Sequence, residues 1–144
     1  MNAKSLTTTT ETWKPIGTTL VGGFRLESIL DTVEGFRIII GTRADEKYVI
    51  RTDVVYYQVH KAAYQAVLSD SAPAPALADT SHALFEVLNS TILRRFTATP
   101  HSDKYARGDL HHFALCLDWT MRIDLIARGE LTIRMAGYED FSGV

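Results

Sequence analysis

The chain has 144 residues, of which 46% are hydrophobic and 22% charged, a composition that excludes a coiled coil or a disordered chain. Fifteen Lys and Arg against seventeen Asp and Glu give a formal net charge of -2 without a basic run, so no nucleic-acid partner is expected. The single Cys116 cannot form an internal disulfide, which predicts a reducing, cytoplasmic location.

One domain between two tails is expected. Residues 1–14 contain a run of four threonines with little to bury and are predicted to form a flexible N-terminal tail. Residues 15–136 form the predicted domain, and 137–144 form a C-terminal tail. No stretch approaches the roughly 20 apolar residues of a membrane span, so no membrane partner is expected.

The first half of the chain predicts an antiparallel meander. Residues 24–30 alternate between apolar and polar side chains, which is the period of a half-buried strand. Residues 36–40 are aromatic and β-branched, as sheets favour. The polar stretch 43–47 is predicted to be a hairpin loop that leads into a strand at 48–51, and a further strand at 54–59 follows.

The middle of the chain predicts the main helix. Residues 61–68 suit a short helix or an irregular exit from the strand, and 69–78, with two prolines among alanines, is predicted to be a loop. Asp79 or Thr80 can then cap a helix. Apolar residues follow at three- and four-residue steps, namely Leu84, Phe85, Leu88, Ile92 and Phe96. We therefore predict an amphipathic helix over about 80–97.

The last third of the chain shows the clearest alternation. Residues 113–117 and 122–127 alternate strictly and predict two paired strands. Gly129-Glu130 is predicted to turn the chain into a third strand at 131–135. The expected fold class is therefore α+β, with antiparallel meander sheets and one main amphipathic helix packed on one face.

The register of this final hairpin follows from its loop. A two-residue loop at 119–120 would place Leu115 opposite Asp124 and force a carboxylate onto the apolar face. A three-residue loop at 119–121 sets Leu115 opposite Leu125 instead and is preferred. The side chains of His112, Asp118, Arg122 and Asp124 then share the opposite face.

That polar face holds the candidate site residues His112, Asp118, Arg122 and Asp124, with Asp118 opposite Arg122. The types of zinc ligand on this face, His112, Cys116, Asp118 and Asp124, have no recognised ligand spacing, so no metal is expected. Cys116 lies on the same strand roughly 13 Å from His112, too far for an activating hydrogen bond. No phosphate or dinucleotide motif is present, so no cofactor and no catalytic residue are predicted.

Tyr56 and Tyr57 send their rings to opposite faces of one strand. One ring is expected in the core and the other at a partner, because exposed tyrosine is enriched at interfaces. Tyr57 is included among the residues expected to contact a partner or ligand.

The strand blocks together resemble small uncharacterised bacterial α+β proteins, some of which resemble immunity proteins encoded beside secreted toxins. The resemblance is carried by residues 36–40, 48–50 and 54–59 and by 112–115 leading into 122–126. It implies a non-enzymatic protein that binds another protein, with His112 and Asp124 as shared positions that have no known chemical role.

Two functions follow from these patterns. The first hypothesis is a bacterial protein-binding module, immunity-like or regulatory, that uses an exposed sheet face or the helix–sheet edge. The alternative is a small-ligand-binding protein or enzyme with an apolar cavity between a curved sheet and the helix. A preformed pocket lined by convergent polar groups would favour the alternative. A third, purely structural reading is self-association through open sheet edges.

Overall fold

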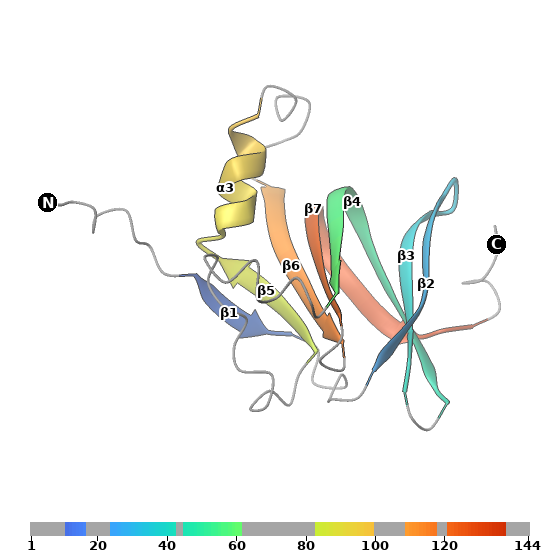
Figure 1. The fold of residues 1–144 in the computed structure, drawn as a ribbon. Coiled ribbons are helices and arrows are strands. Elements are labelled where there is room, and N and C mark those ends of the chain that lie inside the picture. The colour runs from blue at the N-terminus through green and yellow to red at the C-terminus, as the bar shows by residue number, and fades with distance from the viewer. Residues whose placement is uncertain are drawn as a thin grey trace, which may run out of the picture.

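The computed structural model describes residues 11–16, 24–42, 45–61, 83–99, 109–117 and 121–137. These residues form a seven-stranded antiparallel sheet and one short helix (Figure 1). Strands account for 73% of them and helix for 9%. The predicted α+β class is therefore wrong, because the described chain is nearly all-β.

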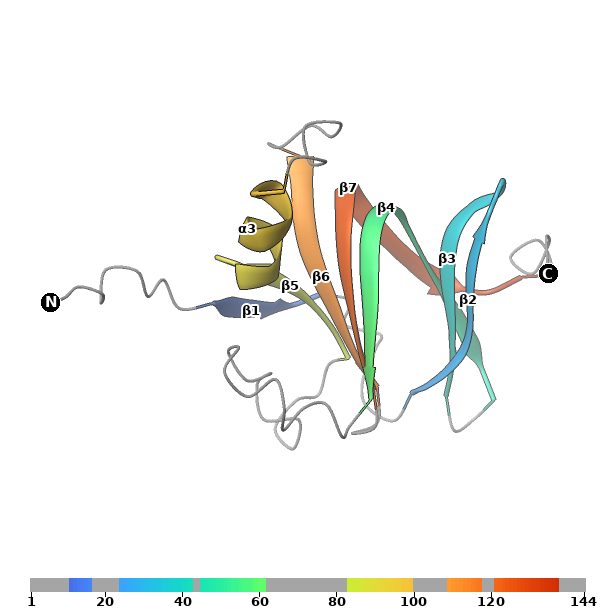
Figure 2. The ribbon, with the colours of Figure 1, turned by 45° about the horizontal axis from the view of Figure 1, so that its top comes forward.

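In chain order the strands are Thr12–Pro15 (β1), Arg25–Thr32 (β2), Gly35–Gly41 (β3), Lys47–Lys61 (β4), Leu84–Leu88 (β5), Leu110–Leu117 (β6) and Met121–Met135 (β7), and the helix is Thr91–Thr97 (α3). The order within the sheet is β1-β5-β6-β7-β4-β3-β2. The long central strands β4 and β7 bend along their length (Figures 1 and 2). The sheet is therefore strongly curved, and α3 lies against the side formed by β5 and β6.

The predicted meander is confirmed, since β2, β3 and β4 pair antiparallel in sequence order. Two predicted strand boundaries are wrong. Strand β4 continues through 52–53, and β7 continues through Gly129-Glu130, where a turn was predicted. Register shifts after Arg51 and Val54 mark irregularities in the β4–β7 ladder, and Gly129 has a φ of 72°, which glycine adopts without steric cost. Bulges therefore bend these strands where the sequence predicted ends.

The helix predicted over 80–97 is wrong in its first half. Leu84–Leu88 is strand β5, which pairs with β1 and β6, and the helix is confined to Thr91–Thr97. Asn89, at a φ of 57°, and the N-cap Ser90 separate the two elements. A short apolar run fits a helix or a buried strand equally well by spacing, and sheet pairing decided between them.

The hairpin of β6 and β7 has a different register from the predicted one. Leu115 pairs with Ile123 rather than with Leu125. This is a shift of two positions, and side chains alternate with a period of two, so every side chain keeps its predicted face. The residues joining the strands, 118–120, lie outside the described residues, as do most of the segments predicted at 61–68 and 69–78.

One face of the curved sheet forms the hydrophobic core. Its wholly buried members come from strands on both sides of the bend and include Ile38, Ile40, Leu84, Leu115, Ile123 and Leu125. Burial of each such side chain stabilises the fold by about 1.5–3 kcal/mol. The core therefore joins strands from both halves of the sheet.

The segment assigned to the N-terminal tail contributes a strand. Residues 12–14 belong to β1, where Trp13 packs edge-on against Phe85 of β5 with ring centroids 5.6 Å apart. Ile16 packs against the core. The helix among the described residues is too short to cross a membrane.

Candidate functional site

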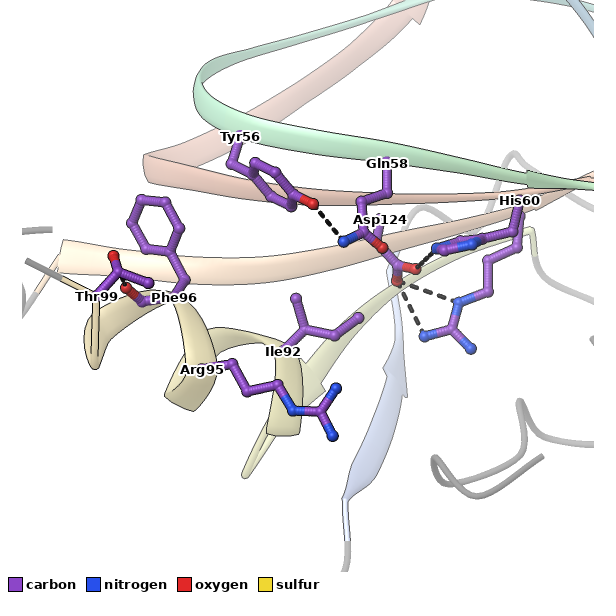
Figure 3. Close-up of a pocket in the computed structure, with 9 residues that line it drawn as sticks. Tyr56, Gln58, His60, Ile92, Arg95, Phe96, Thr99 and Asp124 are labelled. Carbon is purple, nitrogen blue, oxygen red and sulfur yellow. Dashed lines mark hydrogen bonds and ion pairs between the residues drawn. The ribbon is translucent and has the colours of Figure 1, made fainter. Parts of the chain in front are cut away.

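A cavity of about 410 Å³ lies between α3 and the sheet (Figure 3). Its sheet wall is formed by Tyr56, Gln58 and His60 of β4 with Arg122 and Asp124 of β7, and its helix wall by Ile92, Arg95, Phe96 and Thr99. The sheet residues alternate along paired strands, with Gln58 opposite Asp124 and His60 opposite Arg122. The period of two therefore brings all of them to one face. We call this space the helix–sheet pocket.

Asp124 forms the polar centre of the pocket and is only 1% exposed. Its Oδ1 accepts hydrogen bonds from His112 Nε2 at 2.7 Å and from Arg122 Nε and Nη2 at 3.1 and 3.0 Å. Burial alone would raise the pKa of Asp124, but the hydrogen bonds and charges of His112 and Arg122 outweigh burial and lower the pKa. Asp124 is therefore an ionised carboxylate at neutral pH.

A hydrogen-bonded chain ties Asp124 to the start of α3. Ser90 Oγ lies 2.6 Å from His112 Nδ1 and accepts the backbone N–H of Leu93 at 2.9 Å, which caps the helix. His112 Nε2 carries the hydrogen that reaches Oδ1 of Asp124, because an ionised carboxylate only accepts hydrogen bonds. The helix wall and the sheet wall are thus fixed to each other.

Ser90, His112 and Asp124 are the residue types of a nucleophilic triad, but their placement does not suit nucleophilic catalysis. Ser90 is 3% exposed, does not line the helix–sheet pocket and already serves as the helix cap. Asp124 is the member of the chain that reaches the cavity. The chain therefore orients a carboxylate and does not present a hydroxyl nucleophile.

The second carboxylate oxygen of Asp124 is buried and has no hydrogen-bond partner among the described residues. His60 Nε2 lies 3.2 Å from this Oδ2, which is within ion-pair distance although the geometry is not that of a hydrogen bond. A buried acceptor without a donor costs about 1–3 kcal/mol. A ligand that donates a hydrogen bond to Oδ2 would remove this cost and so stabilise the complex.

The two arginines of the pocket differ in their surroundings. The Arg122 guanidinium binds Asp124 and lies over the Trp13 ring, 4.7 Å from its centroid, so β1 also holds it. Arg95 on α3 is exposed and makes neither a hydrogen bond nor an ion pair in the described part of the chain. The pocket therefore contains one neutralised cation and one without a counter-ion among the described residues.

Apolar and aromatic contacts complete the pocket. Tyr56 of β4 and Phe96 of α3 have ring centroids 6.0 Å apart, so the two walls also meet through their rings. The Tyr56 hydroxyl accepts a hydrogen bond from Gln58 Nε2. The pocket thus combines aromatic surface with groups that donate and accept hydrogen bonds, as small-molecule sites do.

The predicted site residues divide into three groups. The structure brings His112, Arg122 and Asp124 together, at 1%, 8% and 1% exposure, on a face that α3 covers. Tyr57 lies on the other face, opposite Leu125, where its ring contacts Phe36 at 5.2 Å. Asp118 lies outside the described residues.

Sequence reasoning missed His60, Ser90 and Arg95. The alternation of Tyr56, Gln58 and His60 would have placed those three on one face, but nothing local relates β4 to β7. The capping role of Ser90 was hidden because the helix was predicted to begin near residue 80. The pairing of β4 with β7, which are far apart in the chain, brings His60 to the site, and local spacing does not predict that pairing.

The fold and the pocket define a nearly all-β protein with a ligand-sized cavity between a curved sheet and a helix. Comparisons of the chain with models of protein families, with curated proteins and with solved structures found no match. The resemblance to immunity proteins stays a prediction, and function is argued from the pocket.

Proposed function

We propose that the protein binds a small organic molecule in the helix–sheet pocket. The observation that carries this proposal is Oδ2 of Asp124, a buried acceptor without a hydrogen-bond partner in the described chain, on a cavity of about 410 Å³. Small-molecule sites span roughly 300–1,000 Å³. An O–H or N–H of a ligand of that size would supply the donor that Oδ2 lacks.

The pocket is suited to an apolar ligand body with a polar end. Ile92 and Phe96 supply apolar surface from α3, and Tyr56 supplies an aromatic face from β4 (Figure 3). The Ser90–His112 bond holds α3 on the sheet before any ligand binds. A site that is ordered in advance spends less of its binding energy on ordering side chains.

The burial of the polar face argues against docking of a protein partner there. His112 and Asp124 are almost completely inaccessible, so they cannot contact a flat protein surface. The lowered pKa of Asp124 makes it a weak base, so it is better suited to hold a donor than to remove a proton. Both observations favour binding of a small molecule.

A fragment screen followed by NMR tests this proposal. Small phenols, alcohols and amines are added to the ¹⁵N-labelled protein, and binding is expected to shift the backbone amide signals of Gln58, Ile92, Phe96 and Asp124. Ile92→Trp fills the cavity from the helix and Gln58→Trp fills it from the sheet, and each is expected to abolish these shifts.

The control places the same bulky side chain on α3 outside the pocket. Arg94 is exposed and does not line the cavity, so Arg94→Trp is expected to retain binding. The proposal is wrong if no fragment shifts the pocket signals, or if both filled variants bind fragments as the unchanged protein does.

A further inference from the structure

We infer that the ligand of the helix–sheet pocket is a small organic anion, with its acidic group beside Arg95 and an O–H or N–H donor at Asp124. This inference rests on the proposed function and names the chemical class of the ligand. It follows from the charges, the shape and the sequence neighbours of the pocket.

The charges that line the pocket do not cancel. The described lining residues include two arginines, Arg95 and Arg122, and one carboxylate, Asp124. Arg122 donates two hydrogen bonds to Oδ1 of Asp124, so these two charges neutralise each other. Among the described residues the charge of Arg95 is unmatched, so it would attract an anion that enters the pocket.

The positions of the two polar ends match a single ligand. Ile92 and Arg95 are three residues apart on α3 and therefore lie on one side of the helix. In Figure 3, Ile92 lies between the Arg95 and Asp124 side chains. A ligand with an acidic group at one end and a donor at the other would place its apolar body over Ile92.

The chemistry of the guanidinium selects the anion type. A guanidinium presents its N–H donors as a planar fork that matches a carboxylate or a phosphate with two parallel hydrogen bonds. The hydroxyl of Thr99 donates to the carbonyl oxygen of Phe96 at 2.7 Å and does not compete for that role. A planar carboxylate on an aromatic or aliphatic body that carries an O–H or N–H at its far end is the simplest ligand that satisfies both ends.

The neighbouring Arg94 supplies a matched control. Its guanidinium donates to the Asn89 carbonyl oxygen at 3.4 Å and to Thr91 Oγ1 at 3.3 Å, and it does not line the pocket. Two adjacent arginines on one helix therefore differ in whether they face the cavity. Substituting each in turn separates an effect of the site from an effect of total charge.

The experiment compares acids with their neutral amides. The probes are 4-hydroxyphenylacetate and 4-hydroxyphenylacetamide, with 3-(4-hydroxyphenyl)propanoate and its amide as a second pair, and dissociation constants are measured by NMR titration at pH 7 and low salt. The acid of at least one pair is expected to bind roughly tenfold more tightly than its amide. Arg95→Gln is expected to remove that tenfold preference, and Arg94→Gln to leave it unchanged.

The outcomes separate this inference from the proposed function. Equal binding of acid and amide, an equal loss in Arg94→Gln and Arg95→Gln, or failure of both acids to bind overturns the inference of an anionic ligand. Neutral fragments that still bind, and that Ile92→Trp excludes, would leave the proposed function standing. Absence of all Ile92→Trp-sensitive binding overturns both.

Discussion

The two faces of β6 and β7 are both buried, but different forces hold them. On one face Leu115 and Ile123 pair directly, are wholly buried and belong to the apolar core. Their contribution depends on the area removed from water and hardly on direction. On the other face Asp124 is bound by His112 and Arg122 through directed hydrogen bonds.

The two faces therefore differ in how strongly a single substitution should destabilise the fold. An apolar side chain that is shortened leaves a cavity, but its neighbours lose only contacts. A polar side chain that is removed leaves its partners buried and unpaired, and the cost is then that of an isolated charge. Substitutions on the two faces should therefore follow a definite order.

Asp124→Ala is expected to have the largest effect. It leaves the buried Arg122 guanidinium without its carboxylate, and removal of one partner of a buried pair costs about 3–5 kcal/mol. The free energy of unfolding, measured by urea denaturation, should fall by that amount.

A paired replacement tests the reason for this loss. In the double variant Arg122→Met/Asp124→Leu the unpaired guanidinium is gone and His112 Nε2 still lacks its acceptor, so part of the lost stability is expected to return. A double variant as unstable as Asp124→Ala would show that the unpaired guanidinium does not account for the loss.

Leu125→Ala on the apolar face is expected to cost about 3 kcal/mol, since Leu125 is wholly buried and its truncation leaves a cavity. The same urea titration measures it. Fragment binding at the helix–sheet pocket should be retained, because the side chain lies on the other face. Loss of fragment binding in the folded variant would show that the two faces are not independent.

Ser90→Ala is expected to cost about 1–2 kcal/mol, since it removes the cap of α3 and the partner of His112 Nδ1. Thr91→Ala is the matched control, because the Thr91 hydroxyl accepts only an exposed hydrogen bond from Arg94. Its expected cost is below about 0.5 kcal/mol. Equal losses in the two variants would contradict a special role of Ser90.

The stability that Asp124 contributes is expected to depend on pH. Its pKa is lowered in the folded state, so the contribution is complete above the unfolded pKa, about 3.9, and is lost as the pH falls through the folded pKa. The stability difference between the unchanged protein and Asp124→Asn should therefore shrink below about pH 4, by at most about 1.4 kcal/mol per pH unit. A difference that does not change between pH 6 and 3 would contradict the lowered pKa.

Cys116, also on the polar face, offers a test that leaves stability unchanged. Burial raises the pKa of its thiol to about 11. Iodoacetamide at pH 8 is therefore expected to label the native protein much more slowly than the urea-unfolded chain. Similar labelling rates in the two states would show that the polar face is open to solvent.

Local sequence pattern predicted correctly those strands whose own residues have the composition or the alternation of a strand. The β-branched run of β3 and the alternation along β6 identified these strands without knowledge of their partners. The helix was extended backward over β5 because Leu84, Phe85 and Leu88 suit either element by spacing. Pairing of β5 with β1 and β6 decided that ambiguity.

The candidate site was predicted in part for the same reason. His112, Arg122 and Asp124 lie on two consecutive strands, and the period of two placed them on one face even though the register differed by two positions. His60 and Arg95 come from elements distant in sequence, which no local pattern relates to the hairpin. Asp118 stays a prediction.

The division of the final hairpin into an apolar and a polar face can be predicted from the sequence, because alternation of side chains is a local property of a strand. The enclosure of the polar face cannot, because it depends on contacts between distant segments. The pairing of β4 with β7 and the docking of α3 over Asp124 join segments far apart in the chain. Such contacts depend on the whole curved sheet, and they turn a row of polar residues into a pocket.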